Sequence, residues 1–317
     1  MRILITRRLP EAVLAAARAR FNVVLRDDTR PMGHGECVAA LRDHDAVLPT
    51  LGDAFAAPAF AEAAPLRCRL LANFGVGYNH IDVAAARAAG VAVTNTPGAV
   101  TDATADIAMT LLLMAARRAG EGERLVRAGL WQGWHPTQML GTHVSGRTIG
   151  IIGMGRIGQA VARRAHFGFA MPVVFHNRSA LTLADLPARQ LGSLAELMAA
   201  ADFIVVAVPG GAATRHLIDA AAIAAMRPGA FLINISRGDV VDEAALVAAL
   251  AAGRIAGAGL DVYEQEPAVS EALRALDNVV LLPHLGTAAL EVREAMGMMA
   301  VENLVAHAEG RALPNPV

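Results

Sequence analysis

The stretch Thr148-Ile149-Gly150-Ile151-Ile152-Gly153-Met154-Gly155-Arg156-Ile157-Gly158 determines how the rest of this chain is interpreted. The apolar residues before Gly153 predict a buried β-strand, and the amphipathic segment that follows predicts a helix. The pattern G-x-G-x-x-G between them is the fingerprint of a dinucleotide-binding turn. The stretch lies near the middle of 317 residues, so a domain's length of chain precedes it. We therefore expect a nucleotide-binding domain that is inserted into another domain.

Each residue of this turn has an expected role in holding a nucleotide. Gly153 would allow the tight bend, Gly155 would let the backbone approach a pyrophosphate, and Gly158 would let the helix pack against the strand. The helix beginning near Arg156 would direct the N–H groups of its first turn, including that of Ile157, at the phosphates. The alternative is a glycine-rich turn between strand and helix that binds no ligand.

Short apolar runs alternate with helical patterns along the whole chain, which predicts an α/β protein with parallel sheets. Because single cores stop growing beyond roughly 250–300 residues, the length indicates two domains. We expect two doubly wound parallel-sheet domains. A Rossmann-type nucleotide domain would span residues 99–286, inserted into a flavodoxin-like substrate domain formed by residues 1–98 and 287–317.

The pattern predicts strands at Ile3–Thr6, Val23–Leu25, Ala46–Pro49, Leu70–Asn73, Val91–Thr94, Ile149–Ile152, Val173–Phe175, Phe203–Ala207, Phe231–Ile235, Gly259–Val262 and Val279–Leu282. Among the helices, Pro10–Arg20 and Ile81–Ala89 are expected in the first half, and Thr287–Glu309 closes the chain. The helix expected over Asp102–Ala119 is apolar on most faces, which indicates burial and favours contact with a second subunit.

Composition excludes several classes of function. The net charge is −1, so nothing indicates an electrostatic surface for nucleic acid or for an anionic membrane. No apolar run reaches the length of about 18 residues that a membrane helix requires. Cys37 and Cys68 lack the spacing of a metal site, so we expect no metal and no disulfide. A reducing, cytoplasmic setting follows as the default.

The segment after the second strand of the nucleotide domain bears on the choice of cofactor. An acidic residue at this place would bind the ribose 2′-hydroxyl of NAD, but here the chain reads Asn177-Arg178-Ser179. A carboxylate repels a 2′-phosphate, whereas an arginine with neutral donors attracts one. We therefore expect NADP(H) to be preferred over NAD(H). The alternative is that Arg178 is a solvated turn residue.

Three further segments place polar residues where apolar strands end: Ile233-Asn234-Ile235-Ser236-Arg237-Gly238, Leu260-Asp261-Val262-Tyr263-Glu264-Gln265-Glu266-Pro267 and Leu281-Leu282-Pro283-His284-Leu285-Gly286. In open parallel sheets, ligands bind beyond the carboxyl ends of the strands. One Arg, one Glu and one His are thus expected at the edge that holds the cofactor. None of these residues alone indicates a catalytic site. Their combination with the glycine turn does.

The order G-M-G-R-I-G, N-I-S-R-G, L-D-V-Y-E-Q-E-P, L-P-H-L-G resembles the D-isomer-specific 2-hydroxyacid dehydrogenase family. The resemblance covers essentially the whole chain, including Asn73-Phe74-Gly75-Val76-Gly77-Tyr78-Asn79 near its start. Asn177-Arg178-Ser179 and Trp131-Gln132-Gly133-Trp134 are most similar to the glyoxylate/hydroxypyruvate reductases. The resemblance implies an NADPH-preferring reductase of small 2-oxo acids, with NAD(H) as the alternative cofactor, that dimerises through the nucleotide domain.

The resemblance also implies residue roles. His284 would be the general acid that protonates the carbonyl oxygen during hydride transfer, and Glu266 would hydrogen-bond and orient its imidazole. Arg237 would bind the substrate carboxylate and carbonyl with a fork geometry that lysine cannot copy. The N–H groups of Val76 and Gly77 would hold the carboxylate from the other domain.

For the cofactor, the resemblance places Asp261 beside the nicotinamide carboxamide. Its further implied cofactor residues are Thr104, Pro209, Thr214, Ile235, Ser236, His284 and Gly286. Two departures from the family leave local geometry open: Gly210-Gly211-Ala212-Ala213 replaces bulkier residues, and Asp106 stands where the family usually has Glu.

Trp134 would reach the partner subunit's substrate pocket, the alternative being ordinary interface packing.

Other functions remain open. Formate dehydrogenase is disfavoured because an amide would be expected at Glu266, and phosphoglycerate dehydrogenase because no regulatory domain follows the last helix. A nucleotide-sensing co-repressor on the same fold is the alternative from another class, since such proteins can keep all three catalytic residues.

Overall fold

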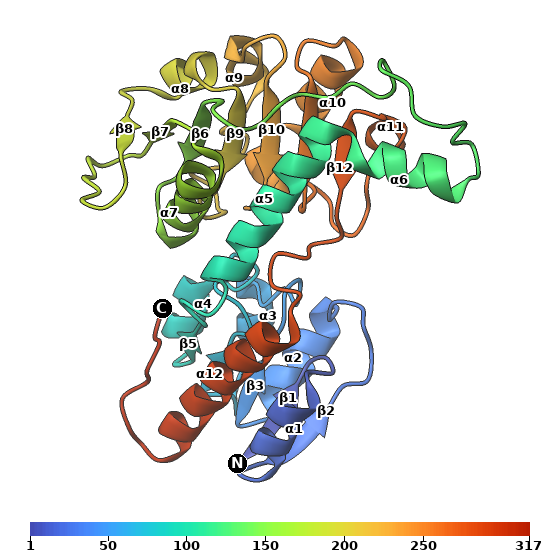
Figure 1. Ribbon diagram of the computed structural model, residues 1–317. Coiled ribbons are helices and arrows are strands. Elements are labelled where there is room, and N and C mark those ends of the chain that lie inside the picture. The colour runs from blue at the N-terminus through green and yellow to red at the C-terminus, as the bar shows by residue number, and fades with distance from the viewer. The chain divides into compact units, whose positions relative to one another are not determined.

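The computed structural model describes residues 1–317, which fold into two compact units. Unit 1 comprises Met1–Val100 and Thr287–Val317, and unit 2 is the continuous segment Thr101–Gly286. Unit 2 is therefore inserted into unit 1. Each unit is a parallel sheet with helices on both faces (Figure 1). None of the helices combines the length and the apolar character that a membrane span requires.

Unit 1 has a five-stranded sheet in the order β2-β1-β3-β4-β5, which is the flavodoxin-like order. The strands are β1 (Arg2–Ile5), β2 (Asn22–Leu25), β3 (Ala46–Leu48), β4 (Leu70–Ala72) and β5 (Ala92–Thr94). The helices are α1 (Glu11–Arg18), α2 (His34–Asp43), α3 (Ala57–Glu62), α4 (Val83–Ala88) and α12 (Leu290–Ala308). Side chains alternate along each strand, so Ile3 and Ile5 pack under α1 and α12, while Leu4 packs under α2 and α3.

Unit 2 has a seven-stranded sheet in the order β12-β11-β10-β9-β6-β7-β8. The strands are β6 (Ile149–Ile152), β7 (Val173–His176), β8 (Ala188–Gln190), β9 (Phe203–Val206), β10 (Phe231–Asn234), β11 (Gly257–Leu260) and β12 (Val279–Leu281). The helices are α5 (Thr101–Arg117), α6 (Ala119–Arg127), α7 (Arg156–Arg163, continued by a π-helical turn Arg164–Gly168), α8 (Leu194–Ala200), α9 (Ala220–Ala225), α10 (Glu243–Ala251) and α11 (Glu271–Arg274). The chain runs outward from β6 in both directions, so the order reverses between β6 and β9.

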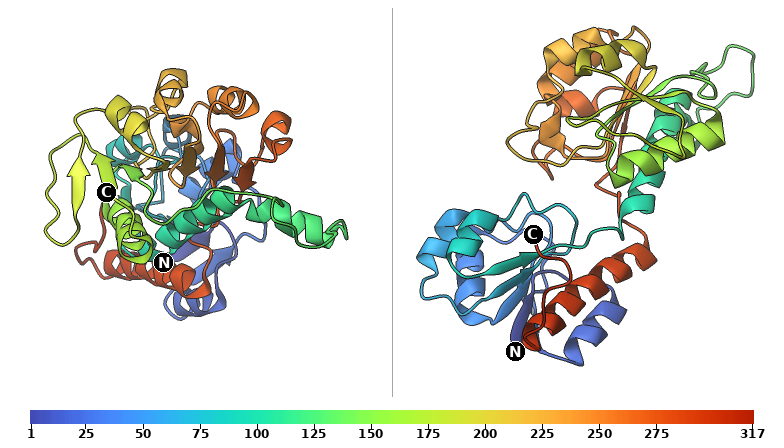
Figure 2. Two further views of the ribbon diagram at one scale, coloured as in Figure 1. Left: turned by 45° about the horizontal axis from the view of Figure 1, so that its top comes forward. Right: turned by 90° about the vertical axis from the view of Figure 1, so that its left-hand side faces the viewer.

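Both faces of the unit 2 sheet are covered, which explains its continuous apolar strands. One core cluster packs α5 and α7 against Ile149 and Ile151, and the other packs α8, α9 and α10 against Ile152. Figure 2 shows the two helical layers around the strands. All neighbouring strands are parallel, so the loops that follow them gather at one edge of the sheet.

The α/β class and both parallel sheets are as the sequence predicts, and most strand bounds agree within one residue. Three of the differences have a clear local cause. The strand expected at Gly259–Val262 lies at Gly257–Leu260, because Asp261 and Val262 already belong to the following loop. The helix expected to reach Ala119 ends at Arg117, since Arg118 is left-handed with φ of 53° and a second helix begins after it. Strand β8 was not predicted, because Ala-Arg-Gln contains no apolar run.

Candidate active site

The glycine turn lies where the strand order reverses, between β6 and β9. Gly153 has a φ of 94°, and a side chain there would bring a Cβ within 2.8 Å of the Ala207 carbonyl oxygen. A Cβ at Gly158 would lie 2.2 Å from the carbonyl oxygen of Gly153, so only glycine lets α7 approach the strand. A Cβ at Gly155 would meet nothing within 4 Å, so this backbone borders open space.

The first turn of α7 fits a pyrophosphate. The helix begins at Arg156, directly after Gly155, and no side chain caps its N-terminus. The N–H of Met154 is already used, because it donates to Oδ1 of Asn177 at 3.2 Å. The N–H groups of the first helical turn therefore remain for a ligand, and the open space beside Gly155 admits it. The turn has the shape that a bound dinucleotide requires.

The loop after β7 contains Asn177, Arg178 and Ser179, and no acidic residue. The side chains of Arg178 and Ser179 are exposed, and Arg178 forms no ion pair with any carboxylate. Asn177 joins this loop to the glycine turn through its bond to Met154. The loop thus presents a guanidinium without an ion-pair partner beside the glycine turn where a nucleotide would bind.

His284 and Glu266 come together in the loops after β12 and β11. The Nδ1 atom of His284 lies 2.8 Å from Oε2 of Glu266. The other carboxylate oxygen of Glu266 accepts the Tyr263 N–H at 3.1 Å. Burial raises the pKa of Glu266, but the hydrogen bond and charge of His284, the Tyr263 N–H and the charge of Arg237 outweigh it, so the pKa lies below its usual value. The carboxylate is therefore ionised and fixes the imidazole, leaving Nε2 for another partner.

Asp261 holds the backbone on which His284 sits. Its carboxylate accepts the N–H of Leu285 at 2.6 Å and that of Gly286 at 2.8 Å, and its carbonyl accepts the N–H of His284 at 2.9 Å. Burial raises the pKa of Asp261, and these N–H donors oppose that rise. His284 has a φ of 55°, a left-handed conformation that costs energy in a non-glycine residue. These bonds hold His284 in that conformation.

Arg237 follows β10, and the buried Asn234 shapes its turn. The Asn234 amide donates to the Arg237 carbonyl at 2.9 Å and accepts from the N–H and hydroxyl of Ser236. Burial lowers the pKa of Arg237, while the charges of Glu266 and Asp239 raise it. A Cβ at Gly210 would lie 2.5 Å from Cγ of Arg237, so the glycine that departs from the family makes room for the arginine stem.

The remaining residues expected at the cofactor lie at the same edge of unit 2. Thr104 is buried and its hydroxyl donates to the Gly286 carbonyl at 3.1 Å. The Thr214 hydroxyl donates to the carbonyl of Pro209 at 2.8 Å, which closes the loop after β9. Ile235 and Ser236 are buried directly beyond β10. Asp106, which stands where the family usually has Glu, pairs with Arg164 at 2.7 Å on the exposed side of α5. This ion pair accounts for the departure from the family.

Val76 and Gly77 belong to unit 1, in the loop after β4. The amide of the buried Asn73 donates to the carbonyls of Gly75 and Gly77, both at 3.0 Å, and the Asn95 amide donates to the carbonyl of Val76 at 2.9 Å. The N–H groups of Val76 and Gly77 have no acceptor in the chain. With the carbonyls bound and these N–H groups unused, the loop is suited to an anion.

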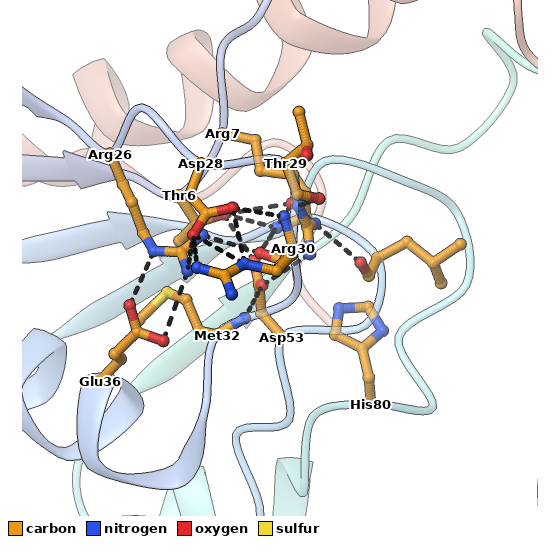
Figure 3. A network of polar contacts seen from close by, with 12 residues as sticks. Thr6, Arg7, Arg26, Asp28, Thr29, Arg30, Met32, Glu36, Asp53 and His80 are labelled. Carbon is orange, nitrogen blue, oxygen red and sulfur yellow. Dashed lines mark hydrogen bonds and ion pairs between the residues drawn. The ribbon is translucent and has the colours of Figure 1, made fainter. Parts of the chain in front are cut away.

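A second polar network stabilises the loops after β1 and β3 of unit 1 (Figure 3). At its centre the fully buried Asp53 accepts from the Thr6 hydroxyl at 2.6 Å, from the Thr50 N–H at 2.9 Å and from the Met32 N–H at 2.9 Å. Arg7 forms an ion pair with Asp53 at 3.2 Å and donates to the Leu51 carbonyl. These contacts fix the loop after β3. Strand β3 pairs with β4, and Val76 lies in the loop that follows β4.

Trp134 lies on the long segment between α6 and β6 and is 80% exposed. Four other large apolar side chains of this region are also exposed: Val126, Leu130, Trp131 and Leu140. The structure therefore leaves the Trp134 indole largely uncovered within its own chain.

Sequence reasoning missed the residues that shape the site through backbone contacts, namely Asn73, Asn95, Asn234 and Tyr263. The Tyr263 hydroxyl donates to the carbonyl of Leu282 at 2.8 Å and so fixes the segment before His284. Asn234 ends β10 and Asn73 directly follows β4, and a buried amide at such a place was the signal that could have identified them.

Residues 109–286 match the family model described as D-isomer specific 2-hydroxyacid dehydrogenase, NAD binding domain. The chain is 44% identical to a glyoxylate reductase of Thermococcus onnurineus over all of its own length and 95% of the relative's. It is 39% identical to a glycerate dehydrogenase of Hyphomicrobium methylovorum, covering 94% of this chain and 93% of the relative.

The chain is also similar to solved structures. An NADPH-dependent glyoxylate/hydroxypyruvate reductase from Sinorhizobium meliloti, in complex with NADP and malonate, superposes with a TM-score of 0.88 at 37% sequence identity. The match covers all of this chain and 96% of the other.

Proposed function

The chain belongs to the D-isomer-specific 2-hydroxyacid dehydrogenase family, and from this we propose that it is an NADPH-preferring reductase of glyoxylate and hydroxypyruvate. As a member of that family it is an NAD(P)-dependent oxidoreductase. The observation that carries the proposal is the 2.8 Å contact between His284 and Glu266 at the edge of the sheet that also bears the glycine turn. The products would be glycolate and D-glycerate.

The reaction needs a proton donor, and His284 fits that role. Reduction turns the C2 carbonyl of a 2-oxo acid into an alkoxide as hydride arrives from the nicotinamide cofactor, which is the chemistry the cofactor supplies. His284 donates a proton from Nε2 to that oxygen, while the Glu266 carboxylate hydrogen-bonds Nδ1 and fixes the orientation of the ring. In the oxidative direction the same nitrogen accepts the proton.

Cationic and N–H donors would bind the substrate. Arg237 follows β10, which is the neighbour of β11 and therefore lies next to the strand that leads to Asp261. Its guanidinium would bind the substrate carboxylate and stabilise the developing alkoxide. The N–H groups of Val76 and Gly77 would bind the carboxylate as well, since they have no acceptor in the chain.

The cofactor would be held by the glycine turn and by the loops after the neighbouring strands. Gly153, Gly155 and Gly158, with the first turn at Arg156 and Ile157, would bind the pyrophosphate. Asp261, Thr104, Pro209, Thr214, Ile235, Ser236, His284 and Gly286 would line the rest of the cofactor site. Asn177, Arg178 and Ser179 would favour a 2′-phosphate, because they offer a guanidinium and neutral donors without a carboxylate. NAD(H) would serve as the weaker cofactor.

We also propose a homodimer formed through unit 2. The exposed apolar side chains around Trp134 are the surface that a second copy would cover, and Trp134 would contribute to the partner's substrate pocket. Cys37 and Cys68 are buried thiols that form no disulfide, which fits a cytoplasmic enzyme.

An assay with two cofactors and several 2-oxo acids tests the proposal. Oxidation of NADPH and of NADH would be followed with glyoxylate, hydroxypyruvate, pyruvate and 3-phosphohydroxypyruvate. The largest kcat/KM is expected for NADPH with glyoxylate or hydroxypyruvate. A preference for the phosphorylated substrate would favour a phosphoglycerate dehydrogenase instead. Nucleotide binding without turnover of any substrate would indicate a sensing protein.

A further inference from the structure

The turn after β7 is stabilised by a single side chain from the neighbouring strand. Gln190 is the last residue of β8, opposite Phe175 of β7. Its amide nitrogen donates to the carbonyls of Asn177 at 3.3 Å and of Ser179 at 3.0 Å. Its amide oxygen accepts the N–H of Leu181 at 2.9 Å. One half-buried amide thus binds three backbone groups of a turn that has no secondary structure of its own.

These contacts match what only a primary amide can offer. Two carbonyls need donors and one N–H needs an acceptor, and the glutamine head group supplies both. The backbone of Gln190 is itself fixed, because β8 pairs with β7 and the Leu191 N–H donates to the Phe175 carbonyl at 2.8 Å. The amide therefore reaches the turn from a rigid strand, which favours one conformation of the turn.

The contacts also change which groups the turn can offer to an anion. The carbonyls of Asn177 and Ser179, which would repel a phosphate, are occupied by the Gln190 amide. The N–H groups of Arg178, Ser179 and Ala180 have no acceptor in the chain, and the Arg178 guanidinium has no ion pair. With its carbonyls bound and its donors unused, the turn is prepared for a dianion.

We propose that Gln190 is a positioning residue that holds the Asn177–Leu181 turn in the conformation that receives the 2′-phosphate of NADPH, and thereby determines the preference for NADPH over NADH. The inference rests on the proposed cofactor preference and deepens it. Gln190 does not touch the cofactor in this role. It acts by removing the ordering cost that a mobile turn would incur when the phosphate binds.

The test compares the ratio of kcat/KM for NADPH to kcat/KM for NADH in the wild type and in Gln190→Met, which keeps the length of the side chain without its hydrogen bonds. The ratio is expected to fall roughly tenfold, with the loss concentrated in KM for NADPH, because the turn would then be ordered only when the phosphate binds. A second variant, Gln190→Leu, also removes the three hydrogen bonds and adds no charge, so its ratio should fall as well. The Leu variant keeps the test open if the Met variant fails to fold.

Gln159→Met is the matched control. Gln159 lies on α7 and donates to the carbonyl of Met154 at 3.2 Å, beside the part of the site common to both cofactors. Any effect of this variant should reach NADPH and NADH alike and leave their ratio at the wild-type value. In an Arg178→Ala background, Gln190→Met should lower the ratio much less than it does alone, because both changes act on the same phosphate contact.

The outcomes distinguish a failure of the Gln190 role from a failure of the proposed preference for NADPH. If the wild type prefers NADH, the proposed cofactor preference is wrong and the role of Gln190 falls with it. If the wild type prefers NADPH and both folded Gln190 variants keep that ratio, only the role of Gln190 is overturned. A fall of the ratio in both variants, absent in the Gln159 control, supports it.

Discussion

Nδ1 of His284 and Oε2 of Glu266 lie 2.8 Å apart, at the ends of loops that follow two neighbouring strands of unit 2. The pair combines an orienting hydrogen bond with a left-handed backbone at His284. A side chain held in an unfavourable backbone conformation by its surroundings is typical of a functional site. The consequences can be tested separately for the carboxylate and for the imidazole.

Glu266→Gln should lower kcat for glyoxylate reduction by roughly 10- to 100-fold at neutral pH, because a neutral amide forms a weaker hydrogen bond with Nδ1 than the carboxylate does and orients the imidazole less firmly. The affinity for NADPH should change much less than kcat. Glu264→Gln is the matched control, since Glu264 binds His216 at 2.8 Å and not His284. An equal loss of kcat in both variants would show that the effect is not specific to the pair.

The same substitution should alter stability as a function of pH. The pKa of Glu266 is lower in the folded protein than its ordinary value of 4.5. Its ionised form therefore stabilises the fold above that pH, and this stabilisation is lost as pH falls through the folded-state pKa. In Glu266→Gln, urea unfolding monitored between neutral pH and acid should show a shallower loss of stability below about pH 4.5 than in the wild type. Parallel curves would contradict the assignment.

Replacing His284 should separate chemistry from backbone strain. Both His284→Asn and His284→Ala remove the proton donor, so kcat should fall by about 10²- to 10⁴-fold in each. Asparagine tolerates the left-handed region better than alanine, so His284→Ala should be less stable than His284→Asn by about 1 kcal/mol. Denaturant unfolding of the two variants measures this difference. Equal stabilities would mean that φ at this position carries no cost.

How far the sequence predicts the site depends on the kind of contact. Arg237, Glu266 and His284 could be predicted to share one edge, because parallel apolar strands precede them and such strands end together. The pairing of Glu266 with His284, at 2.8 Å, does not follow from the strand pattern, since it depends on the path of two loops, and only the family resemblance implied it. Gln190 was invisible to the pattern, because its strand has no apolar run and its partners are backbone groups.

Arg178→Ala tests the charge at the proposed 2′-phosphate site. The ratio of kcat/KM for NADPH to that for NADH should fall roughly 10- to 100-fold, because a guanidinium–phosphate contact is lost. Arg178→Lys should keep part of the preference through its point charge. In the wild type, KM for NADPH should rise with ionic strength more steeply than KM for NADH, since an exposed charge is screened by salt. Identical salt dependence for both cofactors would count against a phosphate contact at Arg178.

Trp134→Ala tests the proposed contribution to the partner's pocket. If the indole reaches that pocket, KM should change across a series of 2-oxo acids of increasing side-chain size, while the dimer persists. Trp131→Ala is the control from the same segment, because Trp131 is also exposed but donates to Gln138. Sedimentation analysis establishes the oligomeric state of each variant. Unchanged KM values in a dimeric Trp134 variant would reduce its role to interface packing.

Asp53→Ala should destabilise unit 1 by about 3 kcal/mol, because it leaves the Arg7 guanidinium and several donors without their acceptor in a buried place. Amide hydrogen exchange resolves the effect locally: the N–H groups of Thr50 and Met32, which bond to Asp53, should exchange faster. Asp28→Asn is the control from the same network, because Asp28 pairs with the largely exposed Arg30 and with Arg26, which keeps Glu36 as a second partner, so the change should cost little stability. If Thr50 and Met32 keep their protection in Asp53→Ala, the loop after β3 is held by something other than this carboxylate.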